Sequence, residues 1–133
     1  MIKLTQRLSH VLLAASMLAG GAAMADEKFA NGFQAAEEHE YKKAIAQWEP
    51  LAKQGSPEAM FMLGTLYHSG LAGEADEKTA VSLYHKAAES GHLVAQEYLA
   101  IGYQEGWFGL KQDRKKARYW HKQVKNNPGR MMR

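Results

Sequence analysis

Two stretches of the chain are nearly the same: AMFMLGTLYHSGLAG at residues 59–73 and AQEYLAIGYQEGWFG at residues 95–109. Alanine, leucine, tyrosine and glycine recur in both at one spacing, and corresponding residues lie 36 positions apart. An internal repeat of this length is typical of stacked helical hairpins. We therefore predict an all-α fold, a solenoid of about three helical hairpins.

A second amphipathic segment follows each of these stretches. It begins with an aspartate, Asp76 or Asp113, and continues through alanine to an aromatic residue. An earlier copy of this segment is visible at residues 43–55, which indicates a third hairpin upstream. The residues expected to build the repeats are Ala59, Leu63, Gly64, Tyr67, Gly70, Asp76, Ala80, Tyr84, Gly91, Ala95, Leu99, Tyr103, Gly106, Asp113, Ala117 and Trp120.

Apolar residues recur at intervals of three and four in these segments, which is the spacing of one helix face. Glycine can end such helices in a left-handed turn, and serine or aspartate can cap their starts. The expected helices are roughly 28–38, 41–54, 57–69, 77–90, 93–105 and 114–126. Two residues are unusual inside a helix. Gly64 indicates that the partner helix of the hairpin lies too close to leave room for a side chain. Pro50 is expected to remove one backbone hydrogen bond and to kink its helix.

The N-terminal segment has the features of a secretory signal. Lys3 and Arg7 precede the mostly apolar stretch 8–19, and Ala23 and Ala25 supply the small side chains that a signal peptidase reads. Cleavage is expected after Ala25, which predicts a periplasmic or secreted protein. An uncleaved anchor is the alternative, although the apolar core is short for a membrane span. The chain has no cysteine, so a lipid-anchored lipoprotein and disulfides are excluded.

Charge is divided unevenly along the chain. Residues 26–110 hold 6 Lys or Arg against 13 Asp or Glu, whereas residues 111–133 hold 9 against 1. The basic end is in the simplest case a solvated face, and it could also dock an acidic protein or an anionic envelope surface. Opposite charges at the two ends also permit weak self-association. Nucleic acid is not an expected partner of an exported chain.

The repeat pattern resembles the Sel-like repeat (SLR) subclass of tetratricopeptide-like solenoids. Its unit reads A-xxx-LG-xx-Y-xx-G, a glycine turn, and D-xx-KA-xx-WY-x-KAA-xx-G, which residues 59–91 and 95–125 match closely. Residues 126–128, Asn-Asn-Pro, depart from it, so the last hairpin is either looser or a polar end cap. The expected division is a signal peptide at 1–25, an opening hairpin at 26–56, repeats at 57–92 and 93–127, and a basic tail at 128–133.

The sequence lacks the common catalytic motifs: a Ser-xx-Lys pair, a Gly-x-Ser-x-Gly elbow, a His-Glu-xx-His helix and a glycine-rich phosphate loop. His85 and His92 are separated by the helix stop at Gly91, which disfavours a shared metal face. His121 occupies a position that the family fills with tyrosine, so it is expected to be packed. We predict no enzyme activity, no cofactor and no metal.

The resemblance implies a protein-binding function, that of an envelope adaptor or regulator. An immunity protein against a secreted toxin and a binder of anionic surfaces are the alternatives. The expected partner-binding residues are Trp107, Phe108, Arg118, Tyr119 and Lys115. Trp107 and Phe108 lie in a turn between glycines and could be an exposed anchor or could fold back over the last hairpin.

Overall fold

The structure is a computed structural model that describes residues 24–133. A first helix spans residues 24–37. It is followed by α2 (Tyr41–Lys53), α3 (Pro57–Ser69), α4 (Glu77–Glu89), α5 (Leu93–Glu105), α6 (Arg114–Asn126) and the 3-10 helix η1 (Pro128–Met132). The described residues contain no strand, and the predicted all-α solenoid is confirmed. The predicted signal peptide falls largely on residues 1–23, which lie outside the described part.

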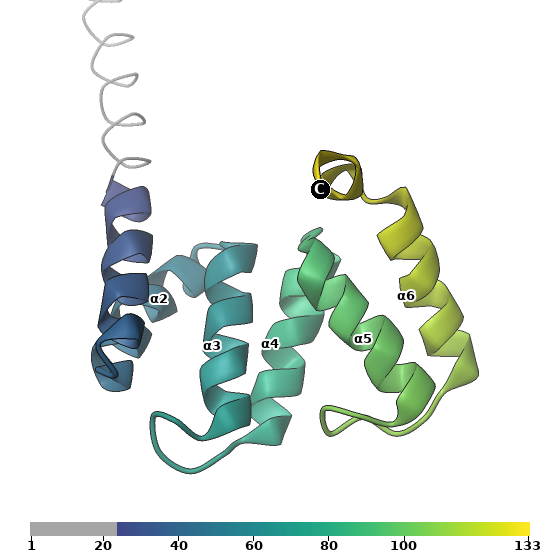
Figure 1. Cartoon of the computed structure of the whole chain (residues 1–133), viewed down its shortest axis with the longest axis horizontal. Coiled ribbons are helices and arrows are strands. Elements are labelled where there is room, and N and C mark those ends of the chain that lie inside the picture. Colours follow the sequence, from purple (N-terminus) through teal and green to yellow (C-terminus); the bar gives the residue numbers. More distant parts are fainter. Residues whose placement is uncertain (1–23) are drawn as a thin grey trace, which may run out of the picture.

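The helices follow one another as hairpins, and the hairpins stack side by side (Figure 1). Among α2 to α6, the most extensive contacts join α3 to α4 and α5 to α6, the two halves of each repeat. Smaller contacts join α2 to α3 and α4 to α5, so each hairpin also rests on the next. None of the described helices has the length and apolar character that crossing a bilayer would require.

Local chemistry sets the helix boundaries. The Ser56 hydroxyl accepts the Ala59 N–H at 3.2 Å to start α3, and Asp76 accepts the Thr79 N–H at 2.9 Å to start α4. Gly70 follows α3 with a φ of 69°, a left-handed conformation that glycine adopts without steric cost. As expected, Pro50 supplies no N–H to the hydrogen bonds of α2. The helix nevertheless continues through it to Lys53, and the Gln54 N–H donates to the Pro50 carbonyl at 3.1 Å.

Large aromatic side chains from one helix fill the space beside small residues of its partner. Trp48 on α2 and Tyr84 on α4 are 0% and 2% exposed. Gly64 lies against the Tyr84 ring, and Gly32 lies in the same way against the Trp48 indole. The role of Gly32 was not predicted, because the turn before α2 is four residues shorter than the turn before α4, which shifts Gly32 out of the 36-residue register.

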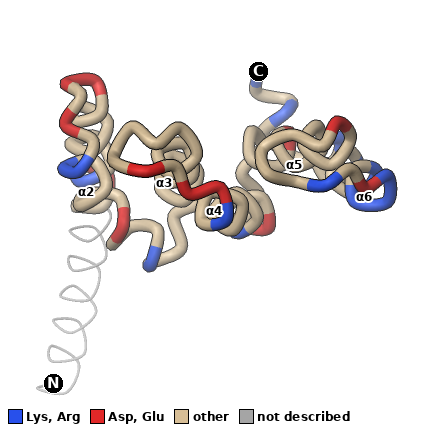
Figure 2. The backbone as a smooth tube through the Cα atoms, turned by 90° about the horizontal axis from the view of Figure 1, so that it is seen from below, with Lys and Arg blue, Asp and Glu red and all other residues tan. Residues whose placement is uncertain are grey.

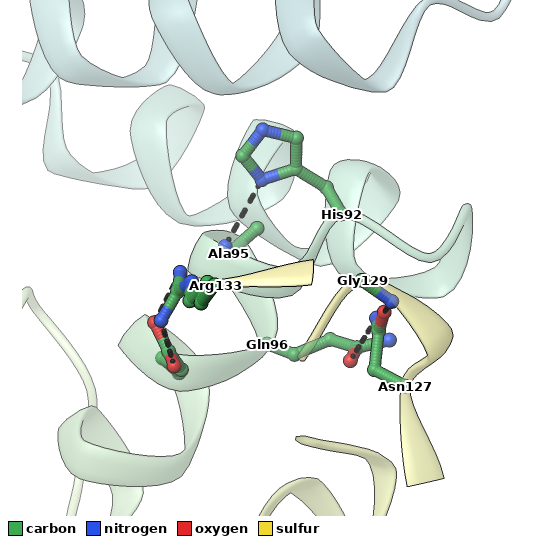
Figure 3. Close-up of polar contacts among 7 residues, drawn as sticks. His92, Ala95, Gln96, Asn127, Gly129 and Arg133 are labelled. Carbon is green, nitrogen blue, oxygen red and sulfur yellow. Dashed lines mark hydrogen bonds and ion pairs between the residues drawn. The ribbon is translucent and has the colours of Figure 1, made fainter. Parts of the chain in front are cut away.

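The C-terminal residues fold back onto the start of α5 (Figure 3). The Asn127 side-chain amide donates to the Gly91 carbonyl at 2.8 Å and to Gln96 Oε1 at 2.9 Å. Asn127 Oδ1 in turn accepts the Gly129 N–H at 2.8 Å, which starts η1. Arg133 then reaches Glu97 at 2.8 Å. The departure from the repeat pattern at residues 126–128 therefore builds a folded end in place of a third glycine stop.

Candidate partner-binding surface

The turn between α5 and α6, residues 106–113, is tightly held. Gly106, with a φ of 74°, ends α5, and its N–H and that of Trp107 both donate to the Gly102 carbonyl at 2.8 and 3.0 Å. The turn closes where the Asp113 N–H donates to the Tyr103 carbonyl at 2.8 Å. Because both ends of the turn are hydrogen-bonded to α5, the side chains on it are presented in a defined position.

Phe108 packs inward between the two repeats. Its φ of 57° places a non-glycine residue in the left-handed region, which costs free energy. The ring stacks on Tyr98 at a centroid distance of 4.8 Å and meets the edge of His68, on α3, at 5.7 Å. This packing offsets the backbone cost. Of the two possibilities left open for the Trp107 and Phe108 pair, Phe108 folds back, and it covers the junction between α3 and α5.

Trp107 points the other way and is 56% exposed. Its indole lies 6.3 Å from the Phe108 ring, nearly at right angles to it. Exposed tryptophan on a rigid turn is uncommon on a solvated surface and is enriched among residues that anchor protein interfaces. The structure therefore separates the two aromatic residues into one packing residue and one surface residue.

Helix α6 presents basic and aromatic side chains beside that turn. Asp113 caps the helix by accepting the N–H groups of Lys115 and Lys116 at 3.0 and 3.1 Å. Trp120 faces the core and Tyr119, its neighbour, is 55% exposed. Figure 2 shows the Lys and Arg positions gathered along α6, whereas most Asp and Glu positions lie on the helices that precede it. The exposed side chains of α6 that belong to the predicted surface are Lys115, Arg118 and Tyr119.

A shallow hollow of about 400 Å³ lies on the outer side of α5 and α6, lined in part by Gln104, Arg114 and Arg118. His121 also lines it and is exposed, with its Nε2 2.9 Å from Gln104 Oε1. The prediction that His121 is packed is therefore wrong. The reason is tertiary: no helix of the described part covers this face of α6.

Three other histidines, His68, His85 and His92, are partly buried in the fold. His85 Nε2 lies 2.9 Å from the Tyr103 hydroxyl, and burial lowers the pKa of the imidazole, helped by the Lys116 charge and opposed by Glu89. His92 caps α5, its Nδ1 accepting the Ala95 N–H at 3.1 Å, and burial lowers its pKa as well. The buried Nδ1 of His68 has no hydrogen-bond partner among residues 24–133.

The cap at His92 was missed by sequence reasoning, which recognises serine and aspartate caps but not histidine. The signal was nevertheless present, because His92 stands 36 residues after Ser56, the cap of the preceding repeat. In residues 24–133 no three His, Asp or Glu side chains gather closely enough to hold a metal ion. Of the histidines, His92 caps α5 and His85 packs against Tyr103 and Trp120.

Two segments of the chain, residues 57–92 and 93–123, match the model of a protein family described as Sel1 repeat. Among solved structures, the chain is similar to c5321, a protective antigen present in uropathogenic Escherichia coli strains and displaying an SLR fold, at 32% identity and a TM-score of 0.58. That alignment covers 66% of this chain and 19% of the antigen. A Sel1 repeat protein from Oxalobacter formigenes is 30% identical with a TM-score of 0.58, and the alignment covers 65% of each chain.

Proposed function

Because the chain belongs to the Sel1 repeat family, we propose that it is a non-catalytic adaptor or regulator of the bacterial envelope that binds a partner protein. Sel1 repeats generally mediate protein–protein interactions, and their solenoids are generally scaffolds without catalytic function. The particular surface proposed here is the turn and helix surface, made of Trp107 together with Lys115, Arg118 and Tyr119 of α6. One observation carries the proposal: Trp107 is 56% exposed on a turn that hydrogen bonds hold in place.

Preorganisation is the physical reason for choosing this turn. A side chain that is already fixed loses little conformational entropy on binding, so more of its contact energy contributes to affinity. The positive side chains of α6 favour a partner whose facing surface is acidic, since complementary charge speeds association and selects among partners. Phe108 is left out of the contact surface because it packs on Tyr98.

The test is recovery of a partner by pull-down of the tagged protein expressed in its own host. Trp107→Ala is expected to lower the affinity for that partner by about tenfold or more, as truncation of a central aromatic anchor does. Leu71→Ala is the matched control, because Leu71 lies in the corresponding turn of the first repeat and is 55% exposed. Equal recovery by both variants would contradict the assignment of Trp107.

Export is the second part of the proposal. The charge pattern and small residues before Asp26 support cleavage after Ala25 and release into the periplasm or the medium. N-terminal sequencing of the protein purified from its host is expected to begin at Asp26. A protein that retains Met1 would contradict cleavage and release, favour the uncleaved anchor, and leave the partner-binding test in place.

A binder of anionic envelope surfaces is the alternative that the charge of α6 favours. Basic residues near a negative membrane surface contribute about 1 kcal/mol each, and salt screens this attraction. Sedimentation with vesicles of phosphatidylglycerol is expected to fall steeply with rising salt if this alternative holds. Binding that resists salt, or that does not occur, would remove it and favour a protein partner.

A further inference from the structure

A separate hollow lies where α2 and α4 pass over α3. Its volume is about 430 Å³, within the range of pockets that hold small ligands or single side chains. The floor is apolar, with Met60 and Leu63 from α3 and Leu83 from α4. Leu63 is 3% exposed and belongs to the core around Trp48, so the floor is continuous with the packed interior.

The corresponding place between α4 and α6 is filled. Trp120 of α6 corresponds to Leu83 of α4, because each stands seven residues after the aspartate that caps its helix. Trp120 is 5% exposed. His85 stands 36 residues after Glu49, and its ring lies against both Trp120 and Tyr103. The hollow is therefore a property of the first junction in this chain and not a general consequence of stacking two repeats.

The Lys116 ammonium adds to the filling of the second junction, lying 5.1 Å from the centre of the Tyr103 ring. Thr79 takes the place of Lys116 in the first repeat, three residues after the capping aspartate, and its short side chain bonds back to Asp76 at 2.6 Å. Tyr67, the counterpart of Tyr103, consequently lines the open hollow. Trp120, Lys116 and the ring of His85 fill the second junction. At the first junction their places are taken by Leu83, Thr79 and Glu49, none of which is aromatic.

The rim of the hollow is positively charged at one end. Lys53 is the last residue of α2 and Lys86 lies in the last turn of α4, and both are exposed. Residues 26–110 contain only 6 Lys or Arg against 13 Asp or Glu, so two of those six line this single hollow. Glu49 contributes the only carboxylate among its lining residues. The lining therefore holds two ammonium groups against one carboxylate, although residues 26–110 as a whole are rich in acidic residues.

We propose that this hollow binds an extended acidic segment of a partner protein, one apolar side chain resting on Leu63 and Leu83 and a neighbouring carboxylate lying between Lys53 and Lys86. The apolar floor supplies affinity by removing the inserted side chain from water, and the two ammonium groups select a negative flank. This inference rests on the proposed binding function and adds a second surface, remote in sequence from Trp107.

The experiment is a titration of the isotope-labelled protein with defined peptides, followed by amide NMR. The probe is an acetylated Glu-Asp-Leu-Phe-Asp-Glu hexapeptide, compared with the same peptide carrying lysine at its acidic positions and with one carrying alanine at its apolar positions. Saturable shifts at the amides of Gly55, Met60 and Leu83 are expected for the first peptide alone. Sodium laurate, titrated in parallel, tests whether a fatty acid is the occupant.

Two variants locate the binding. Leu83→Trp is expected to fill the hollow, as Trp120 fills the second junction, and to weaken peptide binding by about tenfold or more. The pair Lys53→Gln and Lys86→Gln is expected to weaken it by a similar factor, whereas Lys42→Gln with Lys78→Gln, which removes equal charge from exposed positions outside the lining, is expected to leave it unchanged.

The proposal is overturned if the acidic peptide produces no saturable shifts at these amides, if Leu83→Trp binds it unchanged, or if the lysine peptide binds equally well. Saturation by laurate without the peptide would reassign the hollow to a fatty acid and overturn the peptide as occupant. Because the pull-down with Trp107→Ala probes the other surface, failure of either test leaves the other interpretable.

Discussion

The ring of Tyr84 occupies the space in which a side chain at position 64 would lie: a Cβ on Gly64 would come within 2.6 Å of Tyr84 Cε1. Gly64 is therefore retained inside α3 although glycine disfavours a helix by about 1 kcal/mol relative to alanine. The close contact of α3 with α4, the two halves of the first repeat, depends on the missing methyl group.

Gly64→Ala is expected to lower the free energy of unfolding by about 1–2 kcal/mol, because overpacking of the Tyr84 ring outweighs the gain in helix propensity. Ala100→Gly, the reverse change at the corresponding position of the second repeat, is expected to lower it as well, by loss of propensity and a buried methyl. Chemical denaturation measures both. A Gly64→Ala protein more stable than the wild type would contradict the steric explanation.

Acid is expected to weaken the cap of α5. The His92 Nδ1 can accept the Ala95 N–H only while it is unprotonated, and burial lowers the pKa of this imidazole in the folded protein. The unfolded chain, with an ordinary histidine pKa of about 6.5, therefore takes up the proton first. Stability is fully present above about pH 6.5 and falls as the pH is lowered toward the folded pKa.

His92→Asn keeps a capping oxygen that does not titrate in this range, so the loss of stability between about pH 7 and pH 5 is expected to be smaller than in the wild type. His85 has a pKa shifted in the same direction, and it accounts for part of the loss that remains. Urea midpoints at the two pH values provide the comparison. An unchanged difference between them would show that the cap does not titrate.

Replacement of His68 by a residue with an apolar ring is expected to stabilise the protein. Its buried Nδ1 has no hydrogen-bond partner in the part of the chain that the structure describes, and its ring centre already lies 5.7 Å from that of Phe108. His68→Phe is expected to raise the free energy of unfolding by about 1 kcal/mol, since an unsatisfied buried group is removed. His85→Phe is the control and is expected to lower it, because the Tyr103 hydroxyl loses the ring nitrogen at 2.9 Å. Thermal unfolding of both variants would reveal the opposite signs.

The folded C-terminal end is expected to depend on Asn127 more than on Arg133. Asn127 makes three hydrogen bonds, to Gly91, Gln96 and Gly129, and Asn127→Ala is expected to cost about 1–3 kcal/mol and to speed amide exchange in η1. The ion pair of Arg133 with Glu97 is half-exposed, so Arg133→Ala is expected to cost less than about 1 kcal/mol. Equal effects of the two changes would mean that the ion pair holds the tail.

Most of the helix pattern could be predicted because it depends on neighbours close in sequence. The caps at Ser56, Asp76 and Asp113, and the stops at Gly70 and Gly106, act within one helical turn and were visible as residue types. The candidate surface was only partly predictable. Its residues could be named from composition and spacing, but their exposure depends on which helices lie beside them.

The sequence by itself determined the stacked hairpins, since a 36-residue period of small, apolar and capping residues can bury its apolar faces only by repeating one unit against the next. The tertiary structure alone decided three other features: Phe108 turns in while Trp107 stays out, His121 is exposed, and the first junction is hollow where Trp120 fills the second. The physical reason is that burial is a property of packed neighbours from distant segments, and a local pattern of residues does not specify how much space those neighbours leave.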